Sequence, residues 1–201
     1  MRWIGLTGGI ATGKSAAKKI IEQSGFPVID ADLVAHQISQ KGESGHQAIV
    51  QEFGADILQL DGAIDRKKLG EIIFKSETQK LRLESLLHPL IQTVVSDQKS
   101  AFQKAGHAFC FYDVPLLFEK TLQRQFDTTI LIWCDFQTQL SRLMARNGLA
   151  ESQAMDRIHS QLPLIEKLPL ATHCIDNSTT LGSLQLQVNG ILKKLAVISR
   201  A

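Results

Sequence analysis

The chain has few of the residues that mark secreted or metal-binding proteins. Its 201 residues include three cysteines, Cys110, Cys134 and Cys174, which are odd in number and far apart. The sequence contains no CxxC pair, and no spacing of cysteine and histidine in it suggests a zinc site. Because each cysteine lies in or beside an apolar run, we expect reduced core cysteines in a cytoplasmic protein.

A membrane-spanning segment and an excess of charge of one sign are also lacking. The longest uncharged stretch, 177–192, is full of Ser, Thr, Gln, Asn and Gly, so it does not predict a transmembrane helix. Residues 1–6 show no signal-peptide pattern. With 22 Lys and Arg against 20 Asp and Glu, the charge balance favours neither nucleic acid nor a membrane as a partner. We expect a monomer or a weak homo-oligomer.

Five short apolar runs, flanked by Gly, Pro and Asp, predict β-strands separated by helices. This alternation is typical of a parallel sheet that is covered on both faces. We therefore expect a single α/β domain, residues 1–201, with a three-layer fold and a five-stranded parallel sheet. Its core comprises residues 1–31, 106–134 and 170–201. The predicted strands are Trp3–Thr7, Pro27–Ile29, Ala108–Tyr112, Thr129–Cys134 and His173–Ile175.

Nearly eighty residues separate the second and third strands, which is too many for a simple crossover. Residues 32–105 are therefore predicted to form a helical subdomain. After the fourth strand, residues 135–169 predict two helices joined by an Asn-Gly turn, before Pro163 and Pro169 break the pattern. The predicted helices are Leu33–Ser39, Gly45–Phe53, Arg66–Phe74, Glu77–His88, Leu90–Ala105, Thr138–Asn147, Glu151–Gln161 and Leu181–Leu195.

The segment Gly8-Gly9-Ile10-Ala11-Thr12-Gly13-Lys14-Ser15 matches the Walker A pattern. A predicted strand precedes it and a helical pattern, Ala16–Gln23, follows, which disfavours the alternative of a glycine-rich turn capped by a serine. Such a loop aims backbone N–H groups at an anion at a helix N-terminus. Lys14 suits the β- and γ-phosphates, and the hydroxyl of Ser15 suits Mg²⁺. The segment predicts a binding site for nucleoside triphosphate.

Asp30 and Asp32 follow the second strand, whose carboxyl end faces the ligand crevice in a parallel sheet. If the strand geometry continues, the two side chains project to the same side. One of them could accept a proton from a substrate hydroxyl or hold Mg²⁺ through water. His36 lies four residues after Asp32, on the same face of a predicted helix. The alternative is that either aspartate caps this helix.

Two further elements carry charge suited to phosphate chemistry. Asp113 ends the third strand, which is the Walker B arrangement in which a carboxylate reaches Mg²⁺. Arg142 and Arg146 lie four residues apart and share one face of a predicted helix, where two guanidinium groups could stabilise a transferred phosphoryl group. The alternative is a solvated basic face.

Together these segments resemble the dephospho-CoA kinase family over nearly the whole chain. Asp30-Ala31-Asp32, His88-Pro89 and Asp113-Val114-Pro115-Leu116-Leu117-Phe118-Glu119 are more particular to that family than the Walker A segment. Further matches are Arg142, Arg146, Arg157, Gln161 and Ile175-Asp176-Asn177. The chain departs from the usual pattern at Ala11-Thr12, Ala16 and Asn147.

The resemblance implies ATP- and Mg²⁺-dependent phosphorylation of the ribose 3′-hydroxyl of dephospho-CoA, the last step of coenzyme A synthesis. Residues 32–105 would be the acceptor subdomain and residues 135–169 a lid. Asp32, Lys14 and Arg142 would be catalytic, and Ser15 and Asp113 would hold the metal. The implied ATP-binding residues are Gly9, Ile10, Ala11, Thr12, Gly13, Lys14, Ser15, Ala16, Arg142, Arg146 and Asn177. The implied acceptor-binding residues are Thr7, Asp32, His36, Arg66, His88, Pro89, Leu116, Leu117, Phe118 and Glu119.

Other assignments compete with this one. Arg66 could instead cap or salt-bridge the start of a helix, and His88 could simply end one before Pro89. The chain could also be another small P-loop kinase, acting on a nucleoside monophosphate or a metabolite alcohol. Only the acceptor subdomain distinguishes this assignment from a dephospho-CoA kinase. A GTP-dependent switch needs Asp-x-x-Gly and usually Asn-Lys-x-Asp, and the chain contains neither.

Overall fold

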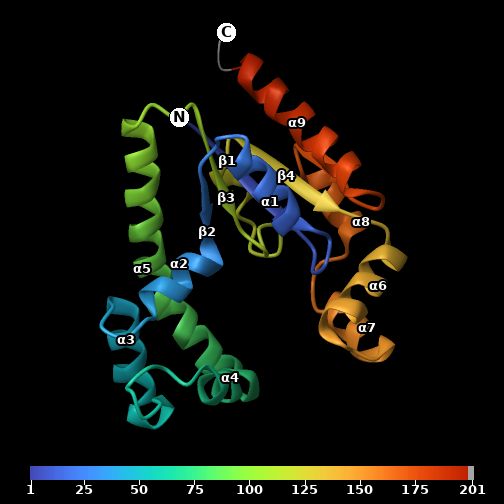
Figure 1. The fold of residues 1–201 in the computed structure, drawn as a ribbon. Helices are drawn as coiled ribbons and strands as arrows, with labels where there is room; N and C mark the ends of the chain where they lie inside the picture. The colour runs from blue at the N-terminus through green and yellow to red at the C-terminus, as the bar shows by residue number, and fades with distance from the viewer. Residues whose placement is uncertain (199–201) are drawn as a thin grey trace. The chain divides into compact units, whose positions relative to one another are not determined.

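The computed structural model describes residues 1–198 and contains a five-stranded sheet in the order β2-β3-β1-β4-β5 (Figure 1). β1 pairs in parallel with β3 and β4, and β4 pairs in parallel with β5. The predicted α/β fold is confirmed, and each strand end lies within one residue of its predicted position. The strands are β1 (Arg2–Gly8), β2 (Val28–Asp30), β3 (Phe109–Asp113), β4 (Thr128–Trp133) and β5 (His173–Asp176).

The chain divides into two compact units, which are described separately. The first unit comprises Met1–Ile29 and the described residues from Phe102 onward, and the second unit is Asp30–Ala101. Within residues 1–198, no helix is long and apolar enough to span a membrane.

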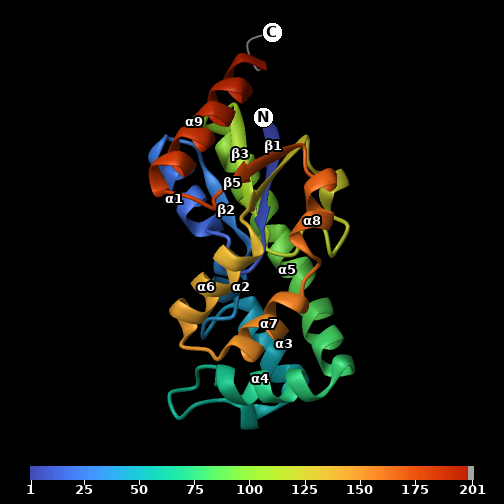
Figure 2. The ribbon, with the colours of Figure 1, turned by 90° about the vertical axis from the view of Figure 1, so that its right-hand side faces the viewer.

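One face of the sheet carries the main core of the first unit. Ile4 and Leu6 alternate along β1 and pack with α1 (Lys14–Gln23) and α9 (Leu181–Ile198). α1 contributes Ala17, Ile20 and Ile21, whose spacing of three and four residues puts them on one helix face. Figure 2 shows α1 and α9 on this face and α8 (Leu164–Lys167) on the other.

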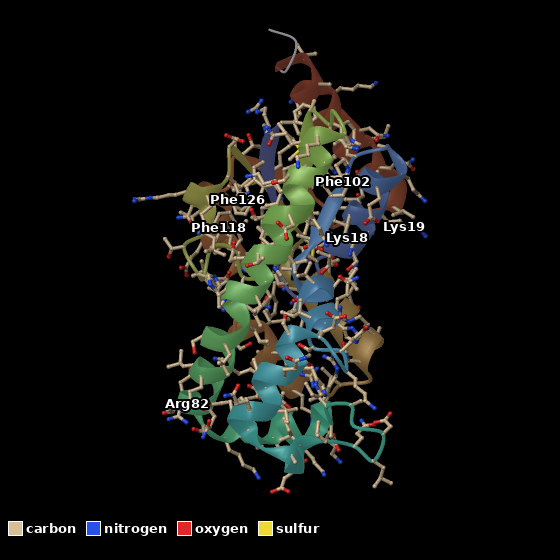
Figure 3. The ribbon with its side chains drawn as sticks, turned by 90° about the vertical axis from the view of Figure 1, so that its left-hand side faces the viewer. Lys18, Lys19, Arg82, Phe102, Phe118 and Phe126 are labelled. Atoms are coloured by element: carbon tan, nitrogen blue, oxygen red, sulfur yellow. The ribbon has the colours of Figure 1, made fainter. Side chains whose placement is uncertain are left out.

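The opposite face of β1 is covered mainly by the segment between β3 and β4. Trp3 stacks on Tyr112 and Phe126, with ring centroids 5.2 and 5.9 Å away. A Cβ built on Gly5 would lie 2.7 Å from Leu117 Cδ1 and 3.1 Å from Phe126 Cδ2, so a side chain there would force these residues to shift. This connecting segment, which contains η2 (Gln123–Gln125) and in which Figure 3 labels Phe118 and Phe126, is therefore a packed layer.

The lid of the sequence prediction is a helical pair in the first unit, α6 (Phe136–Asn147) and α7 (Glu151–His159). The Asp135 carboxylate caps α6 through Thr138, and these hydrogen bonds lower the pKa of Asp135. Gly148 ends α6 in the left-handed conformation, as the Asn-Gly turn predicts. The buried apolar side chains of the pair form a cluster of their own, which comprises Leu140, Leu143, Ala154 and Ile158.

Three details of the first unit differ from expectation. Pro163 and Pro169 do not simply end helical structure, because Pro163 is the N-cap of α8 and Pro169 lies in the first turn of η3 (Leu168–Leu170), where a proline needs no helix hydrogen bond. Cys110 and Cys134 are buried as expected, but Cys174 is exposed. Its strand, β5, is the last in the sheet, and only Ile175 of that strand is buried.

The second unit is helical, and its core contains Ile49, Ile57 and Leu69. The predicted break at Pro89 is wrong, because α5 runs through it as a single helix of 28 residues. A proline removes one hydrogen bond from a helix, and the rest of so long a ladder maintains the helical path. Arg82 of α5 pairs with Glu52 of α3 at 3.0 Å (Figure 3). The elements are α2 (Ala31–Ile38), α3 (Ser44–Phe53), η1 (Ala55–Ile57), α4 (Arg66–Lys75) and α5 (Glu77–Lys104).

We predict that Gly5→Ala lowers the free energy of unfolding of the first unit by about 1–3 kcal/mol, because its methyl group overpacks the site beside Leu117. Gly190→Ala is the matched control. No atom lies within 4 Å of a Cβ there, within α9, and alanine should stabilise that helix by about 0.4–1 kcal/mol. Urea unfolding followed by the fluorescence of Trp3 and Trp133 measures both changes. A stability of Gly5→Ala equal to wild type would refute the packing argument.

Candidate nucleotide and acceptor sites

The phosphate loop joins the central strand β1 to α1. β2 and β3 lie on one side of β1, and β4 and β5 on the other, so the loop lies at the point where the strand order reverses. The N–H and the hydroxyl of Thr12 both donate to the carbonyl of Gly9, at 3.3 and 2.9 Å, which folds the loop back on itself. Gly13 is left-handed, with φ 91°, and α1 has no acidic residue in its first turn. The loop therefore presents a helix N-terminus suited to an anion.

Lys14 and Asp113 form an ion pair at this loop. Asp113 ends β3, is paired in register with Leu6 of β1, and is only 3% exposed. Lys18, labelled on α1 in Figure 3, has its Nζ 3.9 Å from the other carboxylate oxygen of Asp113. A buried carboxylate needs such partners because an isolated charge is costly in the protein interior. The structure thus brings together the predicted phosphate-binding lysine and the predicted metal-binding aspartate.

The oxygen atoms at this loop fit Mg²⁺. Ser15 offers a hydroxyl in the first turn of α1, and Asp113 offers a carboxylate. Residues 1–198 contain no cluster of three or more His, Cys, Asp or Glu side chains suited to a metal. Mg²⁺ does not need one, since it is usually held by one or two protein oxygens together with phosphates and water.

Asn177, which directly follows β5, connects the loop to α6. Its Nδ2 donates to the Thr12 carbonyl at 2.8 Å, and its own carbonyl accepts from Arg142 Nη1 at 2.7 Å. Arg142 also contacts Cys134, whose pKa is raised to about 11, chiefly by burial and against the opposing effect of the arginine. By contrast, Arg146 is exposed and its Nε donates to Asn147 at 2.9 Å. The structure therefore joins Arg142, Asn177 and the loop, while Arg146 contacts its chain neighbour.

The predicted acceptor segment after β3 is tied into the first unit. Leu117 and Phe118 are buried, and the Thr7 hydroxyl donates to the Pro115 carbonyl at 3.2 Å. Glu119 pairs at 2.6 Å with Lys167 of α8, a lysine that is completely buried. This pair was not predicted, because nothing in the sequence marks a lysine beside Glu166 as buried. Acceptor binding by Leu116, Leu117, Phe118 and Glu119 stays a prediction.

The second unit contains a cavity of about 380 Å³ that joins three predicted acceptor residues. Asp32 and His36 reach it from α2, and Arg66 reaches it from the first residue of α4. Arg66 is not the cap of α4, since Asp65 accepts from the N–H groups of Lys67 and Lys68. Leu87 lines the cavity, whereas the lining does not include His88 or Pro89, which follow it in α5. The remaining lining is mostly apolar: Ala35, Ile49, Ile64, Leu69, Ile73 and Leu83.

The expectation that Asp30 and Asp32 share one side of an extended strand is wrong. β2 ends at Asp30 and α2 begins at Ala31, so Asp32 lies in the first helical turn. Asp30 is the cap of this helix, because its Oδ1 accepts from the Leu33 N–H at 2.9 Å. The capping alternative therefore holds for Asp30, and Asp32 is the aspartate that lines the cavity.

The class follows from the fold and the loop together. A Walker A loop after the central strand of a parallel sheet defines a P-loop nucleotide-binding protein. A family model described as dephospho-CoA kinase matches residues 2–183. The chain is 42% identical over 185 residues to the dephospho-CoA kinase of Listeria innocua, which covers 92% of each sequence. The chain belongs to the dephospho-CoA kinase family.

Two solved structures show the same likeness. TT1252 from Thermus thermophilus superposes with a TM-score of 0.80 at 27% identity, over 96% of this chain and 97% of that one. The dephospho-CoA kinase from Campylobacter jejuni superposes with a TM-score of 0.72 at 30% identity, over 96% of each chain. The likeness thus extends over both units.

We predict that Gly13→Ala weakens the binding of a non-hydrolysable ATP analogue at least tenfold, which is ~1.4 kcal/mol or more. At φ 91° a side chain is strained, and a Cβ would lie 2.1 Å from Asn177 Nδ2, forcing it off the Thr12 carbonyl. Ala11 is also left-handed, with φ 61°, so Ala11→Gly relieves strain while losing one methyl group and should bind within about threefold of wild type. Calorimetric titration measures both, and equal affinities for the two variants would contradict the loop geometry.

Proposed function

We propose that this chain transfers the γ-phosphoryl group of ATP to the ribose 3′-hydroxyl of dephospho-CoA, giving coenzyme A and ADP. Membership of the family supports the reaction. The observation that carries it for this chain is the cavity of the second unit, where Asp32, His36 and Arg66 share a lining that is otherwise mostly apolar. The reaction requires two binding sites, one for the triphosphate and one for the acceptor alcohol.

We assign the triphosphate to the loop of the first unit. The backbone N–H groups around Gly13 and the N-terminus of α1 would receive the phosphate oxygens, and Lys14 would neutralise them. Mg²⁺, which Ser15 and Asp113 would hold, supplies positive charge to the phosphate oxygens when it is bound. Arg142 has a planar fork of donors that suits charge developing on the transferring group.

We assign the adenosine end of dephospho-CoA to the cavity of the second unit. Its apolar side chains suit a purine, and the guanidinium of Arg66 suits the diphosphate that follows the ribose. Asp32 provides a carboxylate at the same cavity, where it would align the 3′-hydroxyl and accept its proton as the bond to phosphorus forms. In a loose transition state this proton leaves late, so alignment contributes more than basicity.

We predict that the purified chain releases ADP with dephospho-CoA far faster than with AMP, adenosine or shikimate. Lys14→Ala should abolish most of this activity, because one positioned donor typically stabilises a transition state by ~3–4 kcal/mol. Circular dichroism of Lys14→Ala checks that it is folded. A coupled assay that shows AMP or shikimate as the preferred acceptor would replace the proposal with another small kinase.

For Asp32→Asn we predict a kcat lower by about 10²–10⁴, with the KM for dephospho-CoA within a few-fold of wild type, because the amide keeps the shape and loses the basicity. Glu71→Gln, which removes an exposed charge from α4 of the same unit, is the control. Steady-state kinetics with both substrates varied separates the two constants. A normal kcat for Asp32→Asn would exclude Asp32 from the chemistry.

A further inference from the structure

Ile10 of the phosphate loop is held on both sides by glutamine side chains. Its N–H donates to Gln161 Oε1 at 2.8 Å, and its carbonyl accepts from Gln139 Nε2 at 2.8 Å. Gln139 lies on α6, and Gln161 follows α7. A backbone N–H can only donate and a carbonyl can only accept, so these contacts fix the orientation of both amide groups.

The Gln139 side of this contact is buried, and the Gln161 side is partly buried. Gln139 is only 4% exposed. A Cβ on the preceding Gly9 would lie 3.0 Å from Gln139 Nε2 and 3.1 Å from Leu164 Cδ2. The side chains of Ile10 and Ala11 pack against the buried cluster of α6 and α7. Losing the hydrogen bond of Gln139 is costly, because a buried polar group is then left unsatisfied.

The two glutamines act on the part of the loop that precedes its anion-binding turn. They hold the two peptide groups that flank Ile10, while the left-handed residues Ala11 and Gly13 follow. Fixing these peptide groups restricts the backbone dihedrals at the start of the turn. The loop then loses less conformational entropy when phosphate binds, which raises affinity without any contact between glutamine and nucleotide.

We propose that Gln139 and Gln161 are positioning residues that preorganise the phosphate loop by holding Ile10. The inference rests on the proposed role of this loop in binding ATP and adds the two residues that set its shape. Neither residue touches the nucleotide in this mechanism, and the acceptor cavity of the second unit is independent of them.

Gln139→Glu and Gln161→Glu form a matched test. Each substitution places one negative charge beside Ile10, so both variants should repel the triphosphate to a similar extent. In Gln161→Glu the new carboxylate still accepts from the Ile10 N–H, whereas in Gln139→Glu it places an acceptor against the Ile10 carbonyl. We expect an ATP analogue to bind Gln139→Glu about tenfold more weakly than Gln161→Glu at pH 8. Lowering the pH should narrow this difference, because the carboxyl group of Gln139→Glu, once protonated, can again donate to the carbonyl.

Two controls separate positioning from loss of structure. Gln137→Glu, an exposed position on α6, should bind the analogue within about twofold of wild type. Dephospho-CoA should bind all three variants as it binds wild type, and their thermal midpoints should be similar. Equal weakening by Gln139→Glu and Gln161→Glu would overturn the inference, because only charge would then matter. If wild type does not phosphorylate dephospho-CoA but the glutamine variants still differ in analogue binding, the proposed function fails and this inference stands.

Discussion

The loop between β1 and α1 must keep several backbone N–H groups aimed at one place. Its glycines do not restrict the backbone to that conformation, because glycine adopts many conformations. Hydrogen bonds and ion pairs from the rest of the first unit restrict it instead. Asn177, from the end of β5, fixes the Thr12 carbonyl, and Asp113, from the end of β3, fixes Lys14. Gln139 of α6 and Gln161, which follows α7, fix Ile10. The order of the strands matters for function because it brings these strand ends to the loop.

The sheet could be predicted closely from the sequence because its strands are short apolar runs that are flanked by Gly, Pro or Asp. The helices of the second unit were harder to delimit, and the error at Pro89 shows why. A proline signals the loss of one hydrogen bond, but the sequence does not show that α5 continues for 15 residues beyond it. The structure also shows why residues alternate along β1. Ile4 and Leu6 face the helices of the main core, whereas Trp3 and Gly5 face the segment between β3 and β4.

Some residues of the candidate sites could likewise be predicted from the sequence, and others could not. The Walker A residues could be identified from the sequence because they are contiguous, and their spacing alone produces the anion-binding loop. Asp30 and Asp32 could be found but not told apart, because the difference depends on the residue at which β2 becomes α2. Gln139 could not be found at all. Its partner is a backbone carbonyl 129 positions away, and no pattern in the chain marks a glutamine that binds main chain.

The four variable positions of the Walker A pattern are constrained in this chain by elements outside the loop. Gly9 is crowded by Gln139, and Ile10 packs into the lid cluster. Ala11 has a left-handed conformation, in which any Cβ is strained, and Thr12 is fully buried with both its hydroxyl and its carbonyl bonded. At Ala11-Thr12, where the chain departs from the usual family pattern, Ala11 packs against the cluster of α6 and α7, and Asn177 binds the Thr12 carbonyl. The loop, α6, α7 and Asn177 therefore form one packed structure within the first unit.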